Sequence, residues 1–226
     1  MKRFPWLTVA VVALCAAASF SDGTALQYER SGEAWRLLTG QMVHWTPRMA
    51  IFDLGMLLGL GAWLEIRGDR RIAAACLVLG AVFTAAAVQL SPELLVYRGS
   101  SGVASALFVL VALRIADSPD PWTRALAFSA VALFLAKAAF ESLAGETLFA
   151  GPLPEGVRVV PLVHLLGGLA GAVAFSAGRW IRHDRSLTPR ASSPRRHTGP
   201  STPGGMPSYL RWRSSPLHRT DRPSRG

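Results

Sequence analysis

Charged residues are scarce in this chain. They make up 17% of its 226 residues, whereas 50% of the residues are hydrophobic and the mean hydropathy is +0.30. A soluble domain of this size normally carries more charge and fewer apolar side chains. The composition therefore excludes an ordinary soluble domain and indicates an integral membrane protein.

The sequence also has little that would bind a cofactor or build a disulfide framework. Its two cysteines, Cys15 and Cys76, both lie within apolar runs, where a thiol behaves as a small hydrophobic side chain. The sequence has no metal-ligand cluster, phosphate-binding glycine loop or nucleotide motif. We therefore expect no cofactor and no metal.

Long hydrophobic runs, in contrast, are plentiful. Six of them come close to the roughly 20 apolar residues that a helix needs to cross a bilayer. We predict an all-α membrane protein whose spans lie near residues 5–21, 49–66, 72–90, 101–116, 122–143 and 159–178. The chain then divides into a first transmembrane helix (1–21), a core (22–185) and a tail (186–226).

The first span also resembles a signal peptide. It follows the basic start Met1-Lys2-Arg3, is short, and contains Ala16-Ala17-Ala18 as a candidate cleavage site. We favour an uncleaved span. Cleavage would leave five helices and would not move any of the candidate site residues.

The distribution of arginines predicts the topology. Lys and Arg are enriched in cytoplasmic loops. With the N-terminus inside, six spans place Lys2-Arg3, Arg67, Arg114 and the segment after Arg179 on the inner side. We therefore expect both termini in the cytoplasm.

Most of the formal net charge of +10 comes from the segment after Arg179. Residues 186–226 are rich in Arg, Ser, Pro and Gly without apolar periodicity, so we expect a disordered cytoplasmic tail. The charge therefore does not indicate a nucleic-acid partner. The tail either binds anionic lipid headgroups or is a tolerated appendage.

A Gly-x-Ser-Gly motif, Gly99-Ser100-Ser101-Gly102, opens the fourth span. Under the predicted topology the fourth and sixth spans run in the same direction. Ser101 begins one of them, and His164 lies about five residues into the other, which is roughly 7 Å at 1.5 Å per residue. The two side chains can therefore share one depth near the outer face.

A serine and a histidine at one depth can perform nucleophilic catalysis. A neutral imidazole within hydrogen-bond reach takes the hydroxyl proton and later protonates the leaving amine. Backbone N–H groups at the start of the helix can stabilise an oxyanion. Ser100 and Ser105 are competing nucleophiles, but Ser105 lies a turn deeper and Ser100 lacks the motif position. Small residues and a packed histidine at helix interfaces are the structural alternative.

Lys137 and Glu141 in the fifth span are four residues apart, the spacing at which side chains meet on one helix face. Ionisable residues within a span usually have a partner. We interpret the pair first as an ion pair that orients the helix and second as part of a substrate cleft.

At these motifs the chain resembles the rhomboid intramembrane proteases, most closely their bacterial branch called rhombosortases. The resemblance covers residues from about 25 to 180 and is carried by residues 33–40, 43–45, 97–103 and 164–171. It implies a six-transmembrane-helix rhomboid-like bundle with Ser101 and His164 as a dyad that needs no aspartate. It also implies that Trp35-Arg36 helps to hold a first loop embedded at the membrane interface.

One part of the sequence departs from this pattern. Many rhomboids carry a His and an Asn four residues apart in the second span near the oxyanion, where this chain has Met49 and Asp53. Methionine cannot donate a hydrogen bond, and an ionised Asp53 would repel an oxyanion. Gly99, Asp53 and His44 are therefore candidates to line the site, with a structural role for His44 favoured over a functional one.

The resemblance implies a serine endopeptidase of the bacterial inner membrane whose active site opens to the periplasm. Its expected partners are the lipid bilayer and transmembrane protein substrates, namely secreted proteins with a C-terminal Gly-Gly sorting segment. Two alternatives remain. One is a catalytically inactive rhomboid-like protein that binds transmembrane clients. The other is a small transporter component, which the sequence favours least because it has no internal repeat.

Overall fold

The computed structural model describes residues 4–21, 23–148, 154, 157 and 160–187. Side chains are described as far as residue 181. The tail that we predict to be disordered therefore lies outside the described residues from position 188 onward, as does the basic start at residues 1–3.

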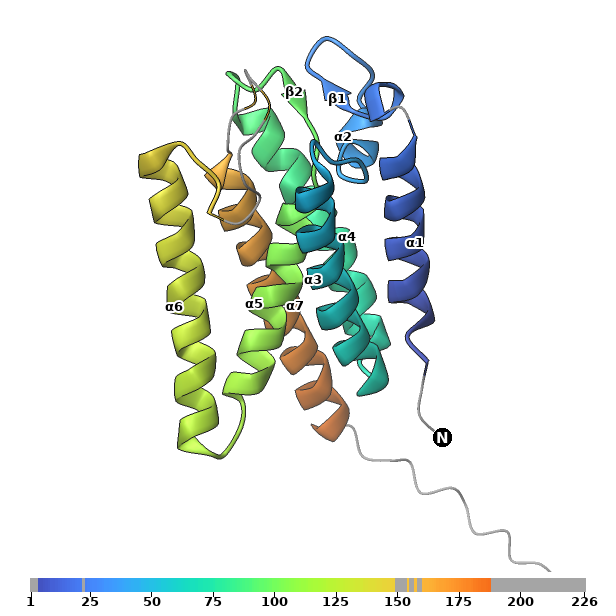
Figure 1. Ribbon diagram of the computed structural model, residues 1–226. Helices are drawn as coiled ribbons and strands as arrows, with labels where there is room; N and C mark the ends of the chain where they lie inside the picture. The colour runs from blue at the N-terminus through green and yellow to red at the C-terminus, as the bar shows by residue number, and fades with distance from the viewer. Residues whose placement is uncertain (1–3, 22, 149–153, 155–156, 158–159, 188–226) are drawn as a thin grey trace, which may run out of the picture. The chain divides into compact units, whose positions relative to one another are not determined.

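Within these residues, six long helices run alongside one another, and the short elements gather at one end (Figure 1). The order of the elements is α1 (Trp6–Phe20), η1 (Gly23–Ala25), β1 (Tyr28–Glu29), α2 (Arg36–Thr39), α3 (Pro47–Ile66), α4 (Arg70–Leu90), β2 (Val96–Tyr97), α5 (Ser101–Ala116), α6 (Pro121–Ala144) and α7 (Pro161–Leu187). Each of the six predicted spans is thus helical.

The lengths of these helices differ. Among the residues that the structure describes, four helices are long and apolar enough to cross a membrane, namely α3, α4, α6 and the Pro161–Ile181 part of α7. The helices α1 and α5 are apolar but shorter, with 15 and 16 residues. An all-α membrane protein is therefore confirmed, whereas the count of six spans stays a prediction.

Local sequence signals set the helix boundaries. The side chains of Thr46 and Asp120 accept hydrogen bonds from Met49 N and Thr123 N, and each of these cap residues is followed by a proline at the first helical position. Helix α6 ends at Gly145, whose φ of 71° is the left-handed conformation that glycine adopts without strain.

Helix α5 lies at the centre of the bundle. It packs against α3, α4, α6 and α7, and its most extensive contacts are with α7. Gly167 and Gly171 of α7 lie directly against the backbone of Gly102 and Ala106, where a Cβ on either glycine would overlap a carbonyl oxygen. These two glycines therefore allow α5 and α7 to pack closely against each other.

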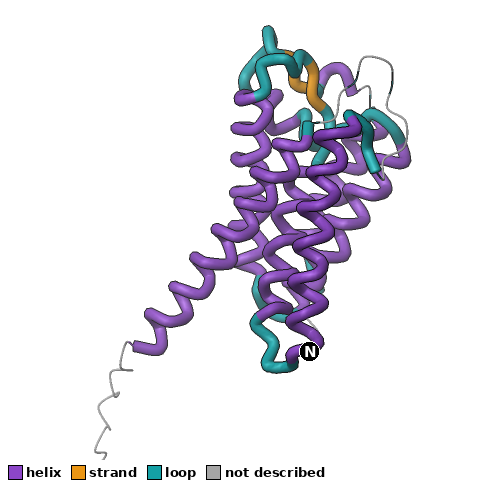
Figure 2. The backbone as a smooth tube through the Cα atoms, turned by 90° about the vertical axis from the view of Figure 1, so that its left-hand side faces the viewer, coloured by secondary structure: helices purple, strands orange, loops and turns teal. Residues whose placement is uncertain are grey.

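The segment between α1 and α3 is tied to the connection between α4 and α5. Tyr28 and Glu29 of β1 pair antiparallel with Tyr97 and Val96 of β2. Arg30 donates to the carbonyl oxygens at the end of α4 and just beyond it, those of Val88, Ser91 and Leu94. Figure 2 shows the strands at the opposite end of the bundle from the last turn of α7. The segment that leads into α5 is therefore held in place by these contacts.

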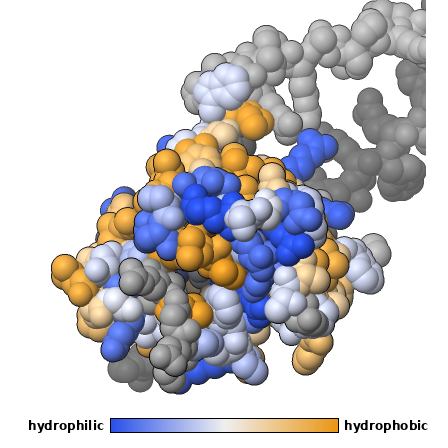
Figure 3. Space-filling view, turned by 90° about the horizontal axis from the view of Figure 1, so that it is seen from above, coloured by the Kyte–Doolittle hydropathy of each residue, from blue (hydrophilic) through white to orange (hydrophobic). Residues whose placement is uncertain are grey.

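Two ion pairs lie at the end of the bundle opposite the strands (Figure 1). Arg114 pairs with Asp69 and Arg179 pairs with Asp117, each at 3.0 Å, so they lie where α3 meets α4 and α5 meets α6. Figure 3 looks down on the other end and shows hydrophilic residues there, with hydrophobic ones at its margins. The grouping fits the predicted topology, and the orientation of the chain in a membrane stays a prediction.

Candidate active site

The backbone before Ser101 is shaped by Gly99. Its φ of 134° is a conformation that side chains rarely allow, and the end of Met49 occupies the place where a Cβ would lie. The hydroxyl of Tyr97 donates a 2.9 Å hydrogen bond to the Gly99 carbonyl. Gly99 therefore shapes the turn that leads into α5, and it does not itself line the cavity described next.

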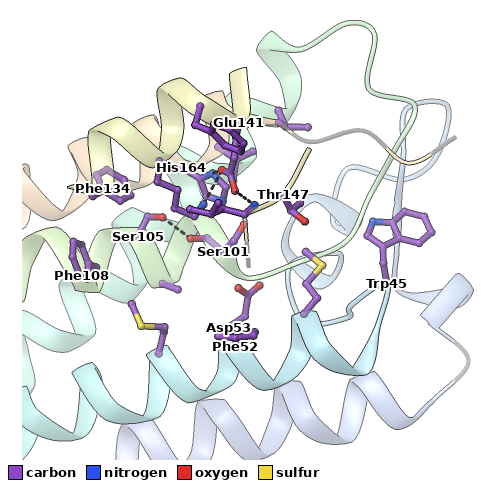
Figure 4. Close-up of a pocket in the computed structure, with 18 of the residues that line it drawn as sticks. Trp45, Phe52, Asp53, Ser101, Ser105, Phe108, Phe134, Glu141, Thr147 and His164 are labelled. Carbon is purple, nitrogen blue, oxygen red and sulfur yellow. Dashed lines mark hydrogen bonds and ion pairs between the residues drawn. The ribbon is translucent and has the colours of Figure 1, made fainter. Parts of the chain in front are cut away.

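A cavity of about 930 Å³ opens beside this turn, between α3, α5, α6 and the start of α7. Ser101 and His164 both line it, and Figure 4 shows His164 above Ser101. Most of the other lining residues are apolar, including Phe108 and Phe134. The structure thus brings the predicted nucleophile and base into one apolar cavity.

The three neighbouring serines differ in their surroundings, and Ser101 is a lining residue of the cavity. Ser100 is 2% exposed, and its Oγ lies 3.1 Å from His44 Nε2, outside the cavity. Ser105 lines the cavity, but its Oγ donates a 2.8 Å hydrogen bond to the Ser101 carbonyl one turn back. The two competing nucleophiles therefore already have hydrogen-bond partners.

The resting site is loosely arranged. Across the described part of the chain, no hydrogen bond joins Ser101 to His164, and the Ser101 side chain instead contacts the Tyr97 hydroxyl. Burial raises the pKa of Tyr97 and the Asp53 carboxylate adds to this increase, so Tyr97 stays a neutral partner. Catalytic hydrogen bonds are often long before a substrate is bound.

Backbone donors for an oxyanion are present at the start of α5. The first turn of a helix leaves N–H groups without intrahelical partners, and Ala104 N is the first to bond back, to the Ser100 carbonyl. The N–H of Ser101 is thus free of the helix ladder and lies beside its own nucleophilic oxygen. This group is the backbone half of a candidate oxyanion hole.

Met49 and Asp53 both line the cavity, as their predicted position requires. Asp53 Oδ2 is buried without a hydrogen bond, and His44 Nε2 lies 3.4 Å from it. Methionine cannot donate, so only a protonated Asp53 would add a side-chain donor beside Ser101. The two residues that differ from the usual rhomboid pattern, Met49 and Asp53, therefore both lie in the cavity.

His44 does not itself line the cavity and is placed by three contacts. Its Nδ1 lies 2.9 Å from Ser19 Oγ, and its Nε2 lies near Ser100 Oγ and Asp53. These contacts connect α1, α3 and the residue before α5. The ring therefore braces Ser100, the residue next to Ser101, and the structural role favoured for His44 stays a prediction.

Trp35 and Arg36 are not brought into the site. Trp35 is 49% exposed and precedes α2, while Arg36 pairs with Glu33 at 2.7 Å and stacks on the Trp35 ring. Arg36 also donates to the Thr24 carbonyl. These contacts stabilise the fold of the first loop, and the embedding of this loop at the membrane interface stays a prediction.

Lys137 and Glu141 do line the cavity, and they do more than pair with each other. Their Nζ and Oε2 atoms are 2.7 Å apart, and the same Oε2 lies 3.1 Å from Nδ1 of His164. Sequence reasoning found the pair but missed the contact with His164. The spacing of residues within α6 cannot show which other helix packs against the Lys137–Glu141 pair.

A family model described as the rhomboid domain matches residues 31–179. The chain belongs to the rhomboid family. The rhomboid family consists of intramembrane serine proteases that act on membrane proteins within the bilayer, together with some inactive members. A search of curated proteins finds no match. With its apolar helices, this rhomboid protein is a multi-pass membrane protein.

Proposed function

We propose that this rhomboid protein is an active serine endopeptidase in which Ser101 is the nucleophile and His164 the general base. The observation that carries the proposal is that both side chains line one cavity, with Ser101 at the free N-terminal end of α5.

The cavity supplies the groups that peptide hydrolysis needs. Ser101 Oγ attacks the carbonyl carbon of the scissile bond while its proton moves to His164 Nε2. The N–H of Ser101 donates to the oxyanion that forms. His164 then passes the proton to the leaving amine, which gives an acyl-enzyme. A water that loses its proton to His164 hydrolyses this ester and releases Ser101.

The walls of the cavity fit a substrate that arrives from the lipid. Phe52 and Met56 of α3 and Leu133 and Phe140 of α6 line the cavity and are between 37% and 71% exposed. Exposed apolar side chains on transmembrane helices face lipid. A membrane-anchored segment therefore has an apolar route between α3 and α6 to Ser101, and it must unwind locally to present its backbone.

The proposed substrates are secreted proteins with a C-terminal Gly-Gly segment followed by a transmembrane helix and basic residues. This specificity rests on the resemblance to rhombosortases, and glycines make local unwinding easier. Cleavage near the periplasmic face of a bacterial inner membrane would release such a protein or pass it on for surface attachment.

The test is to express the chain with a Gly-Gly anchored substrate and to compare it with Ser101→Ala and His164→Ala. We expect cleavage by the unmodified protein and none by either variant. Ser105→Ala is the matched control, since Ser105 also lines the cavity. Cleavage by both variants at the unmodified rate would disprove the proposal.

An inactive client-binding protein is the second candidate, and Met49 and Asp53 in the cavity favour it because neither is a ready donor to an oxyanion. A fluorophosphonate probe separates the two functions. Labelling that disappears in Ser101→Ala supports the protease, whereas absence of labelling supports the client-binding protein.

The proposed orientation has its own test. A reporter fused after Arg185 should report a cytoplasmic location, and one inserted in the first loop should report a periplasmic location. The reverse result would place the cavity at the cytoplasmic face.

A further inference from the structure

Glu141 is a buried carboxylate that collects donors from three parts of the chain. It is 2% exposed. Its Oε2 lies 2.7 Å from Lys137 Nζ on the same helix and 3.1 Å from His164 Nδ1 on α7, and its Oε1 accepts a 3.1 Å hydrogen bond from Leu148 N. Figure 4 shows Glu141 beside His164.

The identity of these neighbours fixes the charge of the group. An ionised carboxylate only accepts hydrogen bonds, whereas a protonated one must also donate. Lys137 Nζ and Leu148 N are donors, so the ionised form satisfies every contact that the structure gives Glu141. Lys137 supplies the positive charge that compensates for burying it.

The contact sets the roles of the two ring nitrogens of His164. A carboxylate next to Nδ1 favours the tautomer that carries its proton there, which leaves Nε2 with a lone pair. His164 and Ser101 line the same cavity, so Nε2 is the ring nitrogen left to act as the base for the serine hydroxyl. The Nδ1–Oε2 distance is that of a hydrogen bond but its angle is not, so a small tilt of the ring completes the bond.

We propose that Glu141 is a positioning residue that acts through His164, so that the active site is a Ser101–His164–Glu141 triad rather than a bare dyad. The proposal rests on the proposed protease function. When Ser101 loses its proton to Nε2, His164 becomes an imidazolium with protons on both nitrogens. Glu141 stays ionised and stabilises that cation until the proton leaves with the amine.

The geometry distinguishes this role from that of an ion pair that only orients α6. For that role, Glu141 would need no partner other than Lys137. Glu141 instead reaches across to a different helix and contacts the one nitrogen of His164 that the chemistry does not use. The loop residue Leu148 holds the other carboxylate oxygen, which fixes the direction in which Oε2 points.

The test compares Glu141→Gln with the unmodified protein and with Glu146→Gln, an exposed carboxylate five residues away. In Glu141→Gln we expect kcat to fall on the order of 10²- to 10⁴-fold with KM within about threefold, because the amide no longer orients or stabilises the imidazolium. Glu146→Gln should match the unmodified protein. A kcat of Glu141→Gln within about threefold of the unmodified value would overturn the proposal.

The pH profile is a readout that a purely structural role would not move. The charged and titratable groups that share the cavity with His164 are Asp53, Tyr97, Arg98, Lys137 and Glu141. Without its anion the imidazolium is less stable, so the acidic limb of kcat/KM should move to lower pH. An unmoved limb in Glu141→Gln contradicts the proposal.

A measurement on the unmodified protein keeps the proposal testable if Glu141→Gln does not fold. ¹⁵N NMR of labelled histidine, assigned with His164→Ala, should show the neutral ring protonated at Nδ1. A proton on Nε2 would overturn the role of Glu141. This measurement needs no substrate and therefore tests Glu141 independently of the protease function. If the protease function itself were wrong, cleavage and Ser101 labelling would both be absent from the unmodified protein.

Discussion

Gly167 of α7 lies directly against the peptide backbone of Gly102 in α5, so the two helices meet without a side chain between them. The close approach brings the beginning of α7, with His164, beside the beginning of α5, with Ser101. Packing of two glycines thus sets the geometry of the candidate dyad.

Replacing Gly167 should therefore disrupt the bundle. In Gly167→Val the added carbon atoms would overlap the Gly102 carbonyl, and we expect a loss of about 3 kcal/mol in the free energy of unfolding. Thermal unfolding in detergent micelles measures the loss. Gly55→Ala is the matched control, because nothing lies within 4 Å of the corresponding Cβ. Equal stability of the two variants would contradict the close packing.

Asp53 offers a test of the side-chain half of the oxyanion hole. Asn at this position removes a negative charge from the cavity and adds an N–H donor. We expect Asp53→Asn to raise kcat about tenfold at neutral pH, because an oxyanion is then stabilised rather than repelled. Cleavage of a Gly-Gly anchored substrate measures the change, with Asp53→Leu as a control that removes the charge without adding a donor. A fall in kcat in Asp53→Asn would show that the carboxylate itself is required.

Glu65 joins α1 to α3. Its buried carboxylate accepts hydrogen bonds from Leu7 N, Thr8 N and Thr8 Oγ1, the last two at 2.6 Å. Glu65→Ala leaves these donors without partners, and we expect it to cost about 2–3 kcal/mol of stability. Differential scanning fluorimetry and protease sensitivity of α1 measure the effect. The exposed Glu146→Ala should change neither.

Asp120 makes the start of α6 sensitive to acid. Hydrogen bonds from the Thr123 side chain and backbone lower the pKa of Asp120. A lowered pKa means that the cap stabilises the helix above the usual carboxyl range and loses this effect as pH falls through the folded-state pKa. The protection factors of the amides in the first turn of α6 should therefore decrease on acidification. Asp120→Asn caps without a charge and should remove this dependence; an unchanged dependence would assign it to another group.

Much of the fold could be predicted from the sequence because bilayer-spanning helices carry local signals. Apolar runs of sufficient length gave the positions of all six long helices, and the boundaries at Thr46 and Asp120 carry cap residues followed by proline. The lengths of α1 and α5 show the limit of this reasoning, because a short apolar helix is not by itself proof of a membrane span.

The sequence by itself supplied the candidate nucleophile and the candidate base. Gly99-Ser100-Ser101-Gly102 is recognisable as a motif, and His164 lies at the same predicted depth as Ser101. It also predicted the Lys137–Glu141 pair, whose four-residue spacing is a property of one helix. Only the tertiary structure decided that Glu141 faces His164, that Asp53 points into the cavity and that β1 pairs with β2. These contacts join segments far apart in the chain, and the rotation and approach of packed helices depend on all their neighbours at once.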